Sequence, residues 1–394
     1  MELREYCKYR NERVNSDELN TKNYVSTENL LPNKGGVVEA TSIPNGNVVK
    51  YEEGNILISN IRPYFKKIWL ADRAGGCSAD VLCIQSNENV SSTYLYYLLS
   101  QQSFFDYVMA GAKGCKMPRG DKSHIMEWPV NIPELKEQKR IADFLSSLDD
   151  KIELNRQIND NLEQQALALF RSWFVDFEPF KDGEFVDSEL GMIPKGWKVV
   201  ELETICDVVG GGTPSKSNPE YYCKNGISWI TPKDLSISKA KFTSKGEIDI
   251  TETGYSNSSV KLMPSGSVLF SSRAPIGYVS IATKELCTNQ GFKSLVPKIA
   301  GTCFLYLFLK ENTISIEAQA TGSTFKEASG ALIKSQKVII PDDLLILNKF
   351  EESTKPIFQI QRNLEDENSN LQGLRDSLLP RLMSGELKIN EIDC

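Results

Sequence analysis

The chain has 394 residues, which is enough for two domains and their connectors, and it carries 45 basic and 52 acidic side chains. Its nine cysteines include no CxxC pair and His124 is the only histidine, so neither a disulfide framework nor a structural zinc site is expected. Free thiols instead indicate a reducing cytoplasm. No apolar run is long enough to span a membrane, and the first residues, MELREYCKYRNER, lack the apolar core of a signal peptide.

The net charge of -7 is unevenly distributed along the chain. Residues 1–133 are neutral, residues 134–190 carry -7, residues 191–341 carry +5, and residues 342–394 carry -5. The neutral and basic segments can contact a polyanion although the chain as a whole is acidic. Acidic helices that only face solvent would give the same charges, so charge alone does not decide between these interpretations.

Residues 1–133 are predicted to form a first domain of α+β class. Short β-type runs such as NILIS and KIWLA alternate with turn-rich segments, and a helical stretch follows around residues 92–109. Several stretches recur in the same order later in the chain: MELREYC resembles VELETIC, EGNILISNIRP resembles SGSVLFSSRAP, and VNIP resembles VIIP. The sequence therefore predicts an internal duplication, with a mixed or antiparallel sheet and packed helices in each copy.

A long helix is predicted from Pro133 to about Phe174. At 1.5 Å per residue it would form a rod of roughly 57 Å. Two asparagines in its apolar stripe weaken the stripe but fix register and partner. A single core helix of a globular domain is the alternative, but such helices rarely exceed 20 residues. The stripe, at alternating steps of four and three, consists of Ile141, Leu145, Leu148, Ile152, Asn155, Asn159, Leu162, Ala166, Leu169 and Trp173.

A Pro-, Gly- and charge-rich connector, residues 175–197, leads to the second copy. The predicted segments are 1–133 (first domain), 134–180 (first helix and connector), 181–341 (second domain) and 342–394 (second helix and tail). The second helix contains Pro356, so a kink or a restart is expected near Lys355. Its predicted stripe consists of Ile346, Phe350, Ser353, Ile357, Ile360, Leu364, Glu367, Leu371, Leu374 and Leu378. The residues expected to pair the two helices are Ile141, Leu145, Leu148, Ile152, Leu162 and Leu169 with Ile357, Leu364, Leu371 and Leu378.

The sequence predicts no catalytic site and no metal site. GGGTPSKS (210–217) lacks the GK[ST] ending of a phosphate-binding loop, and neither GxSxG nor HExxH is present. SNPEYY (217–222) differs from the NPPY tetrapeptide of adenine methyltransferases at Glu220. Asp176, Glu178 and Lys181 could form a nuclease-like group, but they lie in the connector rather than on a strand.

The loops of both copies instead offer residues that bind nucleic acid. Lysine and arginine neutralise phosphates, arginine reads guanine, and asparagine or glutamine reads adenine. The first set of expected DNA contacts is Asn60, Arg62, Tyr64, Lys66, Lys67, Lys113, Lys116, Arg119, Lys122 and His124. The second set is Thr213, Ser215, Lys216, Lys233, Ser272, Arg273, Tyr278, Asn289, Gln290, Lys293, Thr321, Ser323, Thr324 and Lys326.

These features together resemble the specificity (S) subunit of Type I restriction-modification systems. The family pattern P-x-x-EQ-x-x-I-x-x-x-L-x-x-L-D-x-x-I matches the start of the first helix at Pro133, Glu137, Gln138, Ile141, Leu145, Leu148, Asp149 and Ile152. LRDSLLPRLMSGE (374–386) resembles the family's ending, and GGTPS, SSRAPIG, NQGF and TGST resemble features of its recognition domains. The second helix lacks the EQ-x-x-I entry and has LILNKF instead.

The resemblance implies two pseudo-repeated α/β target-recognition domains, each reading one half of a bipartite, asymmetric site in double-stranded DNA. Two long antiparallel, coiled-coil-like helices would set the gap between the half-sites. It also implies two methyltransferase (M) subunits that bind S-adenosylmethionine, and restriction (R) subunits that use ATP and magnesium, so this chain itself would hold no cofactor. Docking of M is expected at Arg171, Trp173, Phe174 and Phe177.

Two other classes of function remain open from the sequence. One is a coiled-coil scaffold whose domains bind protein or carbohydrate, which a steep salt dependence of duplex binding would argue against. The other is a methyltransferase fused to a recognition domain, which failure to bind S-adenosylmethionine would remove.

Overall fold

The computed structural model describes residues 1–322 and 326–389. The chain divides into two compact units, of which the first combines Met1–Glu153 with Ser369–Cys394 and the second is Leu154–Asn368. Each long helix therefore contributes one part to each unit. The domain boundaries drawn from the sequence assign each helix to one segment and stay a prediction.

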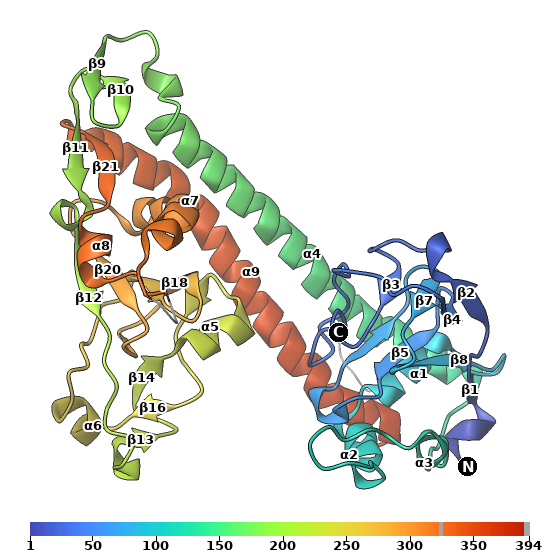
Figure 1. Ribbon diagram of the computed structural model, residues 1–394. Helices are drawn as coiled ribbons and strands as arrows, with labels where there is room; N and C mark the ends of the chain where they lie inside the picture. The colour runs from blue at the N-terminus through green and yellow to red at the C-terminus, as the bar shows by residue number, and fades with distance from the viewer. Residues whose placement is uncertain (323–325, 390–394) are drawn as a thin grey trace. The chain divides into compact units, whose positions relative to one another are not determined.

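The first unit is built on two four-stranded sheets (Figure 1). Strand β5 is buried on both faces, because Ile56 and Ile58 pack with the helices while Leu57 belongs to the core beside the other sheet. This explains why its sequence is a continuous apolar run rather than an alternating one. One sheet has the order β1 (Cys7–Tyr9), β8 (Val81–Ser86), β5 (Ile56–Ser59), β6 (Ile68–Leu70). The other has the order β2 (Arg13–Asn15), β4 (Asn47–Tyr51), β7 (Gly75–Cys77), β3 (Tyr24–Val25). The short helices are α1 (Ser92–Leu99), α2 (Gln102–Ala110) and α3 (Lys122–Met126).

The second unit has a five-stranded and a four-stranded sheet, and α7 packs on β17, β18 and β20. The first sheet has the order β12 (Cys206–Gly210), β20 (Lys293–Pro297), β17 (Val268–Ser272), β18 (Ile276–Ala282), β15 (Phe242–Thr243). The second has the order β13 (Tyr222–Cys223), β16 (Asp249–Ile250), β14 (Ile227–Ile230), β19 (Cys287–Thr288). Two-stranded pairs are β9 (Phe185–Ser188) with β10 (Gly191–Pro194), and β11 (Trp197–Glu201) with β21 (Lys337–Pro341). The helices other than the long ones are α5 (Pro232–Ser238), α6 (Glu252–Ser256), α7 (Thr302–Gln319) and α8 (Gly330–Lys334).

The two units repeat one topology. The order β1-β8-β5-β6 matches β12-β20-β17-β18, and the parallel pair β3 and β7 matches the parallel pair β14 and β19. Even a local contact recurs, because the Cys7 thiol donates to the Leu3 carbonyl at 3.6 Å and the Cys206 thiol to the Leu202 carbonyl at 3.3 Å. The α+β class and the duplication expected from the sequence are confirmed.

The long helices are α4 (Leu135–Phe174) and α9 (Leu344–Ser384), and they run antiparallel in both units (Figure 1). In the first unit Arg375 of α9 lies 2.5 Å from Asp149 of α4. In the second, the Asn155 amide donates to Asn368 at 2.9 Å, and the side chain of Gln361 donates to the Asn159 carbonyl at 3.1 Å. The partner for α4 is thus in the same chain.

The restart expected at Pro356 is absent, because α9 is one continuous helix through this residue. Proline removes one backbone hydrogen bond, which leaves the Glu352 carbonyl without its usual donor. Both Pro356 and Glu352 are on the exposed side of the helix, where water can take the donor's place. The preceding turn is held further by the Thr354 hydroxyl, which donates to the Phe350 carbonyl at 2.9 Å.

The stripe predicted for α4 is buried or half-buried along its whole length. In α9 the predicted Phe350 is buried, but most other buried residues lie one residue later than predicted. Ile360 and Leu374 are 48% and 46% exposed, and Ile357, Leu364, Leu371 and Leu378 are half-buried at the flank. The difference arises because the middle of the buried stripe of α9 includes the polar, hydrogen-bonded residues Thr354, Gln361 and Asn368, while periodicity analysis follows apolar residues. The buried residues are Leu347, Phe350, Thr354, Phe358, Gln361, Asn368, Leu379, Leu382 and Met383.

Candidate nucleic-acid interface

Two loops of the first unit contain the residues that the sequence predicts as DNA contacts. These loops lie against each other and form one surface. The N–H of Arg62 donates to the Pro118 carbonyl at 2.8 Å, and the N–H of Gly120 donates to the Asn60 carbonyl at 3.2 Å. Isolated β-bridges join Arg119 to both Ile61 and Lys113. The loop that follows β5 and the loop 110–124 are therefore held against each other by backbone contacts.

The turn after β5 brings cations and aromatic rings together in this surface. Arg62 and Lys66 both have left-handed backbone conformations and flank the turn Pro63–Phe65. Tyr64 and Phe65 are exposed, with ring centroids 4.7 Å apart. The Nε of Arg62 and the Oδ1 of Asn60 are buried atoms without a hydrogen-bond partner among the described residues.

The other predicted cations of the first unit are mostly held in place. Lys67 donates to the Thr27 carbonyl at 2.5 Å, Arg119 lies 3.2 Å from Asp80, and Lys113 lies 2.6 Å from Asp121. The ammonium group of Lys122 lies 5.9 Å from the Tyr9 ring centroid. Lys116 is exposed in the same loop.

His124 is half-buried and packs against a ring of its own unit, and the DNA contact expected from it stays a prediction. Its ring stacks on Tyr107 at a centroid distance of 4.1 Å and an angle of 8°, and its Nε2 lies 3.2 Å from the Tyr107 carbonyl. Gly111 makes room for the ring, since a Cβ there would lie 2.0 Å from the His124 Cδ2.

Asp121 gives this loop a predictable response to acid. Its carboxylate accepts hydrogen bonds from Lys113 and from the N–H groups of His124 and Ser123, which lower the pKa of Asp121 from 3.8 to about 2. Because the folded state favours the charged form, this stabilisation is complete above about pH 4 and is lost as the pH falls towards about 2. An NMR titration of the carboxyl group gives the pKa of Asp121. Amide hydrogen exchange of residues 111–124 measures the stabilisation of the loop over the same pH range.

The matched variant is Asp121→Asn, which keeps a good N-cap for α3 but has no ionisable group. In this variant the loop should lose the part of its protection from amide exchange that depends on pH in the acid range. An Asp121 titration near pH 3.8 in the unaltered chain would contradict the assignment.

In the second unit, four predicted segments meet at one end of the five-stranded sheet. The N–H of Gly212 donates to the Thr288 carbonyl at 2.9 Å, and the Thr213 hydroxyl contacts the Gln290 side chain. The N–H of Ala328 donates to the Ser272 carbonyl at 2.9 Å. The segments after β12, β17 and β19 and the segment around residue 327 thus come together, and the DNA contacts expected from them stay a prediction.

The carboxylate of Glu327 pairs with two cations of this site. Glu327 lies 3.4 Å from Arg273 and 3.3 Å from Lys293, one oxygen for each. Arg273 is half-buried and follows β17 directly, as Arg62 follows β5 after two residues. The arrangement presents hydrogen-bond donors from Arg273 and Lys293, with Gln290 exposed nearby.

The packing around Gly211, Gly212 and Ser272 shows what each contributes to this site. The backbone amides of Gly211 and Gly212 both donate to carbonyls of the unit. The glycines are needed for close approach, since a Cβ on Gly211 would lie 1.9 Å from the Asn289 carbonyl oxygen. Ser272 is fully buried and donates to the Gly291 carbonyl at 3.2 Å, so it supports the loop rather than contacting DNA.

The remaining predicted residues of the second unit differ in exposure. Tyr278 and Asn289 are half-buried, whereas Ser215, Lys216, Thr321 and Lys326 are exposed. Ser323 and Thr324 lie outside the described residues. The acidic partners Asp80, Asp121 and Glu327 are not among the predicted site residues, which were chosen for positive charge and hydrogen bonding. An acidic residue among clustered cations is the sequence signal that indicates such a partner.

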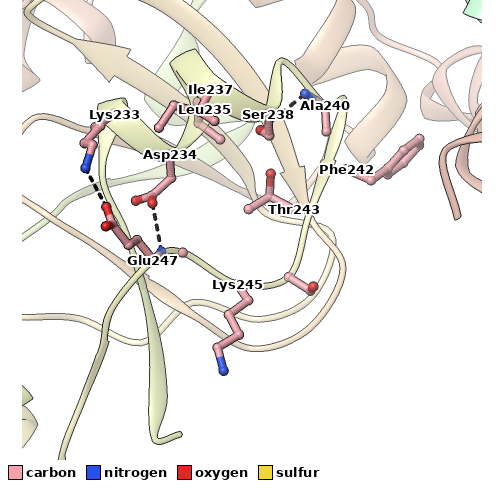
Figure 2. A pocket seen from close by; sticks show the side chains of 12 residues that line it. Lys233, Asp234, Leu235, Ile237, Ser238, Ala240, Phe242, Thr243, Lys245 and Glu247 are labelled. Carbon is pink, nitrogen blue, oxygen red and sulfur yellow. Dashed lines mark hydrogen bonds and ion pairs between the residues drawn. The ribbon is translucent and has the colours of Figure 1, made fainter. Parts of the chain in front are cut away.

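Lys233 lies apart from this cluster, on the wall of a depression of about 460 Å³ beside α5 (Figure 2). Its ammonium group is 2.6 Å from Glu247, whose N–H donates to Asp234 at 2.8 Å. The polar groups drawn across the depression are therefore largely paired with one another, and no nucleophile with an adjacent base is found among its lining residues.

The residues expected to dock an M subunit are mostly part of the second unit's own core. Phe174 and Phe177 are buried, and Trp173 is half-buried with its ring centroid 5.7 Å from that of Phe350. Arg171 is exposed and lies 2.8 Å from Glu311. The rings of the two phenylalanines are covered by this chain, and docking of M at these four residues stays a prediction.

Within residues 1–322 and 326–389, no cluster of His, Cys, Asp and Glu has the arrangement of a metal site. Over the same residues, no helix has both the length and the apolarity needed to cross a membrane.

Comparison with known proteins matches both units to one family. The family described as Type I restriction modification DNA specificity domain matches residues 2–164 and 194–374. The HindI specificity subunit of Haemophilus influenzae is 28% identical over 433 residues, which cover 92% of this chain and 94% of that protein. The MjaIX specificity subunit of Methanocaldococcus jannaschii is 41% identical over 161 residues, 40% of this chain and 37% of that protein. The crystal structure of a Type-I restriction-modification system S subunit from M. genitalium has a similar fold, with a TM-score of 0.59 at 16% identity, covering 97% of this chain and 95% of that one.

Proposed function

Since this chain belongs to the Type I restriction modification DNA specificity family, we propose that each unit reads one half of a bipartite, asymmetric DNA site. The observation that carries the proposal is the repeated placement of cationic loops after equivalent strands. Arg62 comes shortly after β5 and Arg273 directly after β17, and the loops that pack against them also carry lysine. Divergent loops on a repeated scaffold suit two different half-sites.

The chemistry of the two surfaces supports base reading as well as phosphate binding. Arg273 can donate two hydrogen bonds to guanine, and Gln290 can pair with adenine, in the major groove. The exposed rings of Tyr64 and Phe65 can pack on bases or sugars beside the Arg62 cation.

The long helices are proposed to set the gap between the half-sites. Forty residues of α4 correspond to about 60 Å of helix. Two recognition units on one face of a duplex need a separation of about 34–36 Å or a multiple of it, which a helix of this length can supply.

Methylation and cleavage would belong to partner subunits of a cytoplasmic complex. Two M subunits would bind S-adenosylmethionine and modify adenine, and R subunits would use ATP and magnesium. Adenine modification requires the base to leave the stack, so the recognition surfaces must accept deformed DNA.

The apolar flank of the helix pair in the second unit is the proposed docking surface for M. Leu154 and Ile158 of α4, and Ile357, Ile360 and Leu364 of α9, each precede a seam position by one residue. In an antiparallel pair, such positions of both helices lie on the same side. Leu154, Ile158 and Ile360 are 51%, 38% and 48% exposed, which leaves this flank to a partner with an apolar helix.

Replacing Ile360 with Asp should weaken co-purification with M by about tenfold or more, because a carboxylate would be buried against apolar partner residues. The control is Ile314→Asp, at an 83% exposed isoleucine of α7 that is not on the flank. Pull-down of tagged M with each variant measures the effect. Equal recovery of M with both variants would place docking elsewhere.

A genome-wide map of methylated adenines, with the gene intact and deleted, tests the proposed function. Loss of one bipartite, asymmetric motif on deletion is the expected result and would give both half-sites. An unchanged map from an expressed complex would contradict the proposal. Duplex binding that falls steeply with salt would separate it from a scaffold that binds protein or carbohydrate.

A further inference from the structure

Lys241 is a buried lysine that contacts both long helices of the second unit. It precedes β15, and its side chain is 6% exposed. Its ammonium group lies 2.7 Å from the Glu163 carboxylate of α4 and donates to the Gln361 side-chain oxygen of α9 at 2.7 Å. One side chain of the recognition unit thus joins the two helices at the same level.

Two aromatic rings and a second carboxylate also lie around Lys241. Its ammonium group lies 3.4 Å from the Phe358 ring centroid and 4.3 Å from that of Tyr306. The Tyr306 hydroxyl donates to the second oxygen of Glu163 at 2.8 Å. The backbone N–H groups of Lys241 and Phe242 donate to the two oxygens of Glu365 of α9, at 2.8 and 3.1 Å.

A buried ionic network of this kind adds little stability, because apolar residues of the same size often stabilise a core as well as, or better than, a buried ion pair. Buried polar groups can instead fix one arrangement of packed elements, since any other arrangement leaves a charge unpaired. The position of Lys241 between a sheet and two helices fits this second role.

A short path connects Lys241 to the base-reading end of the sheet. The N–H of Ile281 in β18 donates to the Lys241 carbonyl at 2.7 Å. Along β18, Ile276 lies about 17 Å further on, and Arg273 is in the turn just before it. A rotation of the sheet by about 10° at Lys241 would move that turn by about 3 Å, close to the rise of one base pair, about 3.4 Å.

We propose that Lys241 is a positioning residue that fixes the recognition sheet of the second unit on the helix pair, and thereby restricts the spacing between half-sites that the complex accepts. This inference rests on the proposed function.

The first unit lacks an equivalent buried lysine among its described residues. There the Tyr97 hydroxyl donates to Asp149 of α4 at 2.7 Å, but the cation on that carboxylate is Arg375 of α9 rather than a residue of the sheet. Lys34 reaches Asp376 at 3.5 Å, and the Asp376 side chain is 53% exposed. We therefore assign the control of spacing to the second unit.

The test uses the complex of this chain with its M subunits and DNA duplexes that carry both half-sites at the natural spacing, one base pair shorter and one longer. Lys241→Met keeps an unbranched side chain, one atom shorter, against Phe358 and Tyr306 but removes the charge. It should lower the preference for the natural spacing at least tenfold, while methylation at that spacing changes by only a few-fold. Lys298→Met, at an exposed lysine 3.0 Å from Asp207, is the control and should keep the preference.

Equal losses at all spacings, with the preference unchanged, would overturn the inference and leave Lys241 a structural residue only. The double variant Lys241→Met, Glu163→Gln guards against misfolding, because it leaves no unpaired buried carboxylate. If this variant assembles and retains the natural preference, the inference fails. If the unaltered complex methylates no bipartite duplex, the proposed function fails instead.

Discussion

Replacing Phe350 with Ala is expected to lower the free energy of unfolding of the second unit by about 3–5 kcal/mol. Phe350 is fully buried, and its ring lies against those of Phe174, Trp173 and Phe304, with centroids 4.9, 5.7 and 6.4 Å away. The variant leaves a cavity in a rigid aromatic cluster and also removes edge-to-face contacts, each worth about 0.5–1.5 kcal/mol. Urea unfolding of the purified chain, followed by tryptophan fluorescence, measures the change.

Leu345→Ala is the matched control, since Leu345 is on the same helix but 63% exposed. It should change stability by no more than about 0.5 kcal/mol. A loss below about 1 kcal/mol for Phe350→Ala would contradict the packing described for this cluster.

Replacing Arg273 with Ala is expected to cost about 1–3 kcal/mol of DNA binding, roughly 5- to 150-fold in affinity, if the guanidinium reads guanine. Specificity should then relax at one base position of one half-site. Glu327 keeps Lys293 as a partner in the variant, so the loop retains one of its two ion pairs. Binding measured on duplexes changed one position at a time gives both quantities.

A uniform loss across all duplexes would instead identify Arg273 as a phosphate contact. The control is Lys195→Ala, which removes the same charge at an exposed lysine paired with Glu184 at 2.6 Å, away from the loops of the site. Its binding should match that of the unaltered chain apart from a small electrostatic effect.

The helices show how far apolar periodicity predicts a fold. In α4 the buried stripe is mostly apolar, so spacing identifies it correctly. In α9 the buried positions include Gln361 and Asn368, whose side chains hydrogen-bond to α4, and several apolar residues beside them stay partly exposed. These hydrogen bonds across the helix pair favour burial of this stripe, and no single-helix pattern contains that information.

The candidate site shows the corresponding limit for function. Clustered Lys, Arg and Asn in loops of both copies were enough to identify segments that the fold brings together. Lys241 was not identified, because in the stretch SKAKF it is indistinguishable from an exposed lysine. His124 and Ser272 were assigned to DNA from residue type, which does not show that His124 stacks on Tyr107 or that Ser272 is fully buried.

The first unit is discontinuous in sequence, and this affects the order in which it can form during synthesis. Leu379, Leu382 and Met383 complete its core but are translated only after the 215 residues 154–368. At about 5–20 residues per second, the earlier part waits about 10–40 s with its apolar contacts for α9 unmade. The portion of the chain that leaves the ribosome first is thus the last to become stable, and a chaperone that holds nascent chains would be needed most for the amino-terminal unit.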